Sequence, residues 1–190
     1  MIKIYDDIIS KNLQDEILNK LQHGNFPWFL SHNTLGSGEN IESNNIKEYL
    51  QFEHYFYHWD TNDQKTYANS DTTLVDKLLN EIVSFFKWDL FEVFRVKSNL
   101  QTQCENNKKE YYNSPHVDIP NKNLKTMIYY VNNSDGNTFF FDNKENLNII
   151  DSVEPKKGRL VVFDGNILHS GQHPIQSEKR IVLNINFKNE

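Results

Sequence analysis

The chain has 190 residues, a formal net charge of −6 and one cysteine, Cys104. Its length suits one domain with a sizeable core, and a single cysteine excludes an internal disulfide framework and the usual cysteine-rich zinc sites. The acidic balance argues against a broad nucleic-acid-binding surface, although a local basic groove stays an alternative. We expect a cytoplasmic protein with no membrane partner, because the sequence shows neither a membrane-spanning run nor the apolar core of a signal peptide.

Two helices are predicted in the first half of the chain. One covers residues 10–22, with Ser10 as its cap and Gly24 as its stop, and the other covers residues 71–87, with Asp71 as its cap. Each carries one apolar stripe at helical spacing, formed by Leu13, Ile17, Leu18 and Leu21 in the first helix and by Leu74, Leu78, Ile82 and Phe85 in the second. We expect these stripes to cover the outside of a sheet.

The segment between residues 31 and 45 is rich in asparagine and shows no consistent period, so it is predicted to be a loop. Together with residues 103–114 it is a candidate lid over a substrate, since long loops are often functional. A surface loop without a role is the equally weighted alternative. Arg95 and the aromatic residues of the first half are candidate substrate contacts, against a role in the core or at the rim.

Strands dominate the second half of the chain. Short apolar or alternating runs between turn residues predict them, at residues 91–103, 126–132, 138–142, 147–153, 159–163 and 180–187.

Two histidines and one carboxylate form the candidate metal site. His116 and Asp118 are two residues apart, so in an extended strand both project to the same face. His169 follows an apolar strand and the Asp-Gly turn at residue 164, and it could supply a third ligand from a neighbouring strand. Two imidazoles and one carboxylate leave open positions on non-haem Fe(II) and suit oxygen activation. His173 is interpreted as a loop residue near the mouth of the site, because three ligands suffice.

Arg180 begins the last predicted strand and projects with Val182 and Asn184 onto its less apolar face. A guanidinium that points into a small barrel is costly unless it is paired, and its planar fork suits a carboxylate. A dicarboxylate co-substrate would supply that partner. A surface arginine at the start of a strand is the alternative.

At these residues the sequence resembles the Fe(II)- and 2-oxoglutarate-dependent dioxygenases, closest to the prolyl 4-hydroxylase branch. The family pattern is H-x-D, a distal histidine and a basic residue about ten positions later, which His116, Asp118, His169 and Arg180 match in order. The resemblance covers approximately residues 91 to 187. It departs from the pattern at Asp135, where the family has glycine, and at Val182, where the family commonly has serine.

The resemblance implies a double-stranded β-helix barrel, jelly-roll or cupin-like, mostly β and buttressed by the amino-terminal helices. It implies one dioxygenase domain over residues 1–190, in which residues 1–90 support the barrel and the substrate side while residues 91–187 form the catalytic core. It also implies Fe(II), 2-oxoglutarate and O2, with ascorbate as a further candidate. Arg180 and Tyr130 would then hold the far carboxylate of 2-oxoglutarate, and Thr126, on the same strand face as Tyr130, is a further candidate for binding the co-substrate.

The sequence constrains the identity of the prime substrate less than it constrains the metal and the co-substrate. Hydroxylation of a prolyl residue in a protein or peptide is the first hypothesis, because the closest motifs belong to that branch. An oxygenase acting on a nucleobase or small metabolite is the alternative within enzymes. A barrel that binds metal or ligand without catalysis, and a metal enzyme that does not use 2-oxoglutarate, are the remaining alternatives. The sequence leaves the oligomeric state open.

Overall fold

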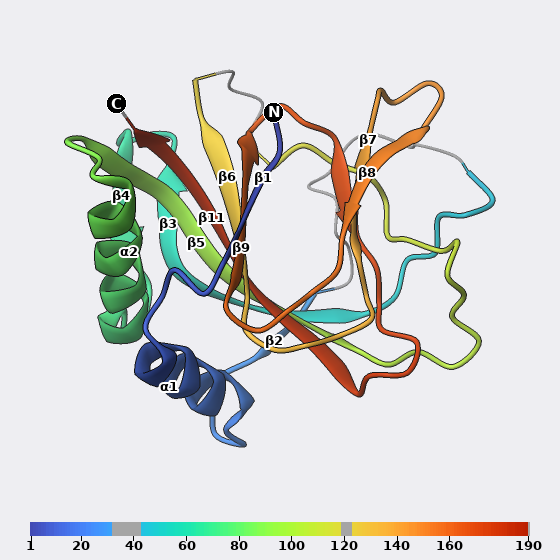
Figure 1. Cartoon of the computed structure of the whole chain (residues 1–190), viewed down its shortest axis with the longest axis horizontal. Helices are drawn as coiled ribbons and strands as arrows, with labels where there is room; N and C mark the ends of the chain where they lie inside the picture. The colour runs from blue at the N-terminus through green and yellow to red at the C-terminus, as the bar shows by residue number, and fades with distance from the viewer. Residues whose placement is uncertain (32–42, 119–122, 190) are drawn as a thin grey trace.

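The computed structural model describes residues 1–31, 43–118 and 123–189. Most of the candidate lid at residues 31–45 therefore lies outside the described residues. Two antiparallel sheets face each other, and two helices pack on the outer side of the larger sheet (Figure 1). This is the layering expected of a jelly-roll barrel supported by helices.

The larger sheet contains strands from both halves of the chain. In spatial order it consists of β1 (Lys3–Asp6), β9 (Arg159–Asp164), β6 (Lys125–Tyr130), β11 (Lys179–Asn189), β5 (Phe91–Thr102), β3 (Gln51–Asp60) and β2 (Phe29–Ser31), with β4 (Lys65–Ala68) paired to β3. The smaller sheet consists of β10 (His169–Gly171), β7 (Thr138–Phe141) and β8 (Ile149–Val153). A single antiparallel bridge from His116 to His169 adds one more segment to the edge of the smaller sheet.

Strand β11 contributes side chains to the core on both faces of the larger sheet. Its apolar residues Ile181, Leu183 and Ile185 belong to the core beneath the helices, together with Leu78 of the second helix, α2 (Thr73–Phe86). Between them, Val182 joins a second core between the two sheets. The alternation of side chains along a strand therefore directs Arg180 and its same-face neighbours into the interior of the barrel.

Both helices form close to the predicted positions, α1 at Lys11–Gln22 and α2 at Thr73–Phe86. Ser10 is the N-cap residue of α1, as predicted, but its hydroxyl donates to Glu81 of α2 at 2.7 Å and makes no hydrogen bond to its own helix. The carboxylate also accepts from the Ser10 amide at 2.6 Å, so Ser10 links the two helices. No helix in the described part of the chain is long and apolar enough to cross a membrane.

The six strands predicted in the second half all form. Strands β1 to β4 and the three-residue β10 were not predicted. The largest omission is β3, whose run of ring-bearing residues between Phe52 and Trp59 has no clean alternation of apolar and polar types. In the structure β3 is partly buried along its length and pairs with β5, which explains why neither face is uniformly polar.

Candidate active site

The three predicted ligands meet between the two sheets. His116 and Asp118 lie in the segment after β5, and His169 begins β10. The main chains of His116 and His169 exchange two hydrogen bonds, of 2.9 and 3.0 Å, which bring the two imidazoles side by side. The Nε2 atoms of His116 and His169 lie 3.8 and 3.6 Å from the Asp118 oxygens. The three residues each offer a ligand atom within 4.8 Å of the others, so they can share one metal ion.

Main-chain carbonyls set the orientation of both rings. The Nδ1 atom of His116 faces the Ser114 carbonyl at 3.1 Å, and that of His169 faces the Ile167 carbonyl at 3.0 Å. A carbonyl can only accept, so Nδ1 donates in each case, and in a neutral ring Nε2 then carries the lone pair. This is the arrangement that a metal-binding histidine requires.

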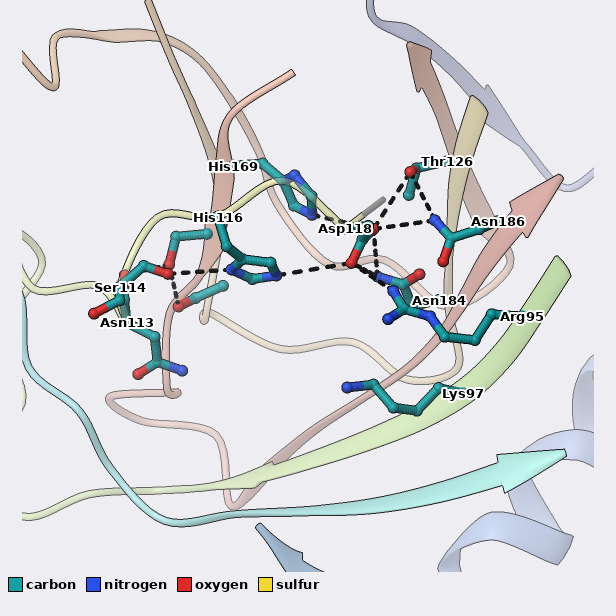
Figure 2. A network of polar contacts seen from close by, with 12 residues as sticks. Arg95, Lys97, Asn113, Ser114, His116, Asp118, Thr126, His169, Asn184 and Asn186 are labelled. Carbon is teal, nitrogen blue, oxygen red and sulfur yellow. Dashed lines mark hydrogen bonds and ion pairs between the residues drawn. The ribbon is translucent and has the colours of Figure 1, made fainter. Parts of the chain in front are cut away.

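Four side chains hold the carboxylate of Asp118 in place (Figure 2). Arg95 of β5 donates to one oxygen at 2.7 Å and Thr126 of β6 to the other at 3.3 Å. Asn184 of β11 donates to both oxygens, at 3.2 and 3.0 Å, and Asn186 donates to Oδ2 at 3.3 Å. The carboxylate therefore has a fixed orientation, as a preorganised metal ligand needs.

The electrostatics of the site favour the protonation states that bind metal. Burial by itself would raise the pKa of Asp118, but Arg95 and the two histidines hold that pKa well below its usual range. Burial, reinforced by the neighbouring His169, lowers the pKa of His116 to about 4. At neutral pH the site thus presents an ionised carboxylate and a neutral His116.

Arg180 lies at the other end of the same pocket, where it is 3 % exposed. Its guanidinium donates to Gln101 and to the Thr138 hydroxyl, both at 2.8 Å, and it lies 5.7 Å from the centre of the Tyr130 ring. The hydroxyls of Tyr130 and Thr138 are 2.6 Å apart. Neither Arg180 partner is charged, and no described residue forms an ion pair with it.

A buried guanidinium without a carboxylate partner is an unfavourable arrangement in a protein interior. A ligand carboxylate would relieve it, and the hydroxyls of Thr138 and Tyr130 stand beside it as further donors. Space is preserved by Gly171, where an added Cβ would lie 3.2 Å from a guanidinium nitrogen of Arg180. The residues present therefore fit both a metal ion and an anionic co-substrate.

The structure places the other predicted residues as follows. Thr126 contacts Asp118, and its predicted contact with the co-substrate stays a prediction. Arg95, suggested as a substrate contact, forms an ion pair with Asp118. His173 lies in the loop after β10 but is 1 % exposed, so it does not stand at an open mouth.

Sequence reasoning missed the residues that support the ligands. Asn184 and Asn186 interrupt an apolar strand at alternate positions, which was the available signal for a polar role on its inner face. Gln101 gave no such signal, because its contact with Arg180 joins positions 79 residues apart.

The fold and the site together define a mononuclear metal enzyme with a buried arginine for an anionic co-substrate. Residues 101–188 match the family model described as 2OG-Fe(II) oxygenase superfamily. Fe(II) and 2-oxoglutarate are the metal and co-substrate that this match and the site imply. No curated protein matches the chain in sequence.

Solved structures of the superfamily share the fold over nearly the whole chain, which confirms the predicted jelly-roll. A prolyl hydroxylase from Trichoplax adhaerens, in complex with a hypoxia inducible factor peptide fragment, is 15 % identical with a TM-score of 0.62, covering 99 % of this chain and 83 % of its own. A 2OG-Fe(II) oxygenase family oxidoreductase from Burkholderia pseudomallei is 7 % identical with a TM-score of 0.69, covering 98 % and 85 %. The α-ketoglutarate-dependent epimerase SnoN from nogalamycin biosynthesis is 11 % identical with a TM-score of 0.62, covering 98 % and 78 %.

Proposed function

We propose that this oxygenase is a dioxygenase that hydroxylates a C–H bond of a second, prime substrate. One observation carries the proposal: the His116–Asp118–His169 group and the unpaired cation of Arg180 lie at the two ends of a single pocket. A metal site alone would suit many enzymes, and a buried arginine alone could be structural. Their combination suits a co-substrate that reaches from the metal to the guanidinium.

Fe(II) held by these residues would supply the oxidising chemistry, with O2 as the oxidant and with 2-oxoglutarate consumed to succinate and CO2. The protein residues need no general base for this chemistry. His116, Asp118 and His169 would hold the metal with three protein ligands and would leave positions for the co-substrate and O2. Arg180, Thr138 and Tyr130 would hold the far carboxylate and so orient 2-oxoglutarate along the pocket. Ascorbate would serve as an auxiliary reductant.

A prolyl residue of a peptide is the first candidate for the prime substrate. The sequence resemblance supports it, as does the presence of prolyl hydroxylases among proteins of similar fold. An epimerase of an antibiotic pathway has a similar fold too, so fold by itself does not choose among substrates. The residues around the metal must make that choice.

Anaerobic titration of Fe(II) and 2-oxoglutarate into the metal-free protein tests the proposal. We expect a visible metal-to-ligand charge-transfer band for the wild type and a weaker band for Arg180→Ala, because that variant lacks the cation for the far carboxylate. Arg159→Ala is the matched control, since Arg159 pairs with Asp6 on the outer surface. Absence of a band in the wild type would contradict the proposal and leave a ligand-binding barrel.

A further inference from the structure

The turn between β6 and β7, residues 131–137, supports the start of β11. Asn132 of this turn binds the main chain on both sides of Arg180. Its amide oxygen accepts from the Ile181 amide at 2.8 Å, and its amide nitrogen donates to the Lys179 carbonyl at 2.9 Å. The position of Arg180 along the main chain is therefore held by the turn in addition to the pairing of β11 with β5.

The same turn packs on the Arg180 side chain and on the loop before β11, residues 172–178. A Cβ atom added at Gly136 would lie 3.1 Å from Cδ of Arg180 and 2.4 Å from the Gln172 carbonyl oxygen. The Gln172 amide donates to the Asn137 carbonyl at 2.9 Å. The turn thus lies in close contact with the arginine and with the segment that leads to it, and any side chain at Gly136 would push them apart.

Asp135 connects the turn to this loop through three consecutive main-chain amides. Oδ1 of Asp135 accepts from Ile175 at 3.2 Å and from Ser177 at 3.0 Å, and Oδ2 accepts from Gln176 at 2.8 Å. Burial by itself would raise the pKa of Asp135, but the amides of Ser177 and Gln176 hold that pKa below its ordinary value. The carboxylate is therefore ionised at neutral pH, and hydrogen bonds to an ionised acceptor are the stronger kind.

We infer that Asp135 is a positioning residue for the co-substrate: it fixes the loop before β11 and so sets the guanidinium of Arg180 for the far carboxylate of 2-oxoglutarate. The inference rests on the proposed function and adds a residue to its co-substrate site. Asp135 stands where the family pattern has glycine, which has no side chain to bind these amides. A guanidinium pairs best with a carboxylate when its planar fork has the right orientation, so the residues that hold Arg180 affect co-substrate affinity without touching the co-substrate.

A role in stability alone is the alternative for Asp135, because its hydrogen bonds stabilise the fold whether or not a co-substrate binds. The two roles differ in which part of the co-substrate they affect. A keto acid that lacks the far carboxylate can still bind the metal but cannot reach Arg180. A positioning role therefore predicts that the loss of Asp135 weakens 2-oxoglutarate and spares the shorter acid.

Anaerobic titrations of Fe(II)-loaded protein make this comparison with 2-oxoglutarate and with 2-oxobutyrate, which has the same keto-acid end and no far carboxylate. The metal-to-ligand charge-transfer band reports the binding of both acids. We expect Asp135→Asn to weaken 2-oxoglutarate about tenfold, the size of loss that follows when a group orienting a metal ligand is removed. Its affinities for 2-oxobutyrate and for Fe(II) should equal those of the wild type.

Asp142→Asn is the matched control for this substitution. Asp142 also accepts from main-chain amides, those of Asn143 at 2.6 Å and Asn148 at 3.1 Å, but it lies in the exposed turn between β7 and β8. The control should keep all three affinities. Asp135→Gly is the second variant, because it removes the carboxylate without placing a side-chain amide against the three donors, and it should repeat the loss of 2-oxoglutarate affinity.

Three results would overturn the inference. One is wild-type affinity for 2-oxoglutarate in both folded Asp135 variants. Another is an equal weakening of 2-oxobutyrate, because the damage would then lie at the metal end. The third is failure of both variants to fold, since Asp135 would then serve the fold itself. Absence of the band in the wild type, or equal wild-type affinity for the two acids, would instead count against the proposed function.

Discussion

At the scale of single residues, the candidate metal ligand Asp118 already accepts several hydrogen bonds. Both of its oxygens accept from neighbouring side chains, and Arg95 places a full positive charge 2.7 Å from one of them. A metal ion at the site must therefore bind a carboxylate that also accepts from the guanidinium of Arg95. We interpret Arg95 as a positioning residue that keeps the carboxylate of Asp118 ionised and oriented. Its positive charge also offsets the negative charge of this carboxylate, which the metal would otherwise neutralise alone.

The titration of His116 predicts how the stability of the metal-free protein depends on pH. Its pKa is about 4 in the folded protein and about 6.5 in an unfolded chain. Between these values the unfolded chain binds the extra proton, so the stabilising contribution is complete above pH 6.5 and is lost as the pH falls toward 4. We expect wild type to lose more free energy of unfolding over this range than His116→Gln does.

Urea unfolding of the two metal-free proteins at a series of pH values measures this difference. The variant serves as the reference because all other titrating groups are common to both proteins. Equal pH dependence of the two proteins would show that His116 takes up its proton at an ordinary pKa in the folded state.

Among the elements, strands with a simple alternation were the predictable ones. In β11 every second residue from Ile181 to Phe187 is apolar, and the sequence therefore located both the strand and the inward face of Arg180. The motif His116-Val-Asp118 and the distal His169 were likewise found, because ligand spacing is a local property. The prediction that these three residues meet is confirmed by the distances between their ligand atoms.

Elements without a local signal were missed. Strands β1 and β2 have four and three residues, and they are held by partners far along the chain. Asn113 shows the same limit within the site: it lies in an irregular polar segment, and only the tertiary fold brings it to Gly171 and to the wall of the pocket. Periodicity reports on one face of one element, whereas a pocket is formed by faces of several elements.

At the scale of whole elements, the packing of α2 on the outer side of the larger sheet can be tested by mutation. Leu78 is fully buried between the helix and the sheet. Leu78→Ala should lower the free energy of unfolding by about 2–5 kcal/mol, because it leaves a cavity in a close-packed core. Affinity for Mn(II) and 2-oxoglutarate should stay unchanged, since the helix lies on the face of the sheet opposite the pocket.

Leu90→Ala removes the same atoms from a side chain that is 45 % exposed, and it is the matched control. Its effect on unfolding should stay within about 0.5 kcal/mol. Chemical denaturation measures both variants, and calorimetric titration measures the affinities. Loss of metal or co-substrate binding in folded Leu78→Ala would show that the helix layer shapes the site.

At the scale of the whole molecule, the site joins parts of the chain that are distant in sequence. Asp118 receives hydrogen bonds from β5, β6 and β11, while His169 belongs to β10 of the facing sheet. A metal bound by His116, Asp118 and His169 thus connects the two layers of the barrel. Arg180 extends the connection, because its partners Gln101 and Thr138 belong to opposite sheets.

A ligand that binds only the folded state stabilises it, so occupancy of this site should be visible in the melting temperature. With Mn(II) and 2-oxoglutarate at a hundred times their dissociation constants, one site contributes about 2.7 kcal/mol. We expect thermal unfolding of the wild type to move to higher temperature on loading and to return to the metal-free value when a chelator is added.

Asp118→Ala separates this effect from non-specific binding, because it removes one of the three ligands that span the sheets. The variant should show no shift on loading and no iron-dependent formation of succinate. Asp151→Ala, on the exposed strand β8, should behave as the wild type in both measurements. If Asp118→Ala kept both the shift in melting temperature and the formation of succinate, the metal would have to bind at another place in the protein. A metal at another place would neither connect the two sheets at this site nor account for the unpaired charge of Arg180.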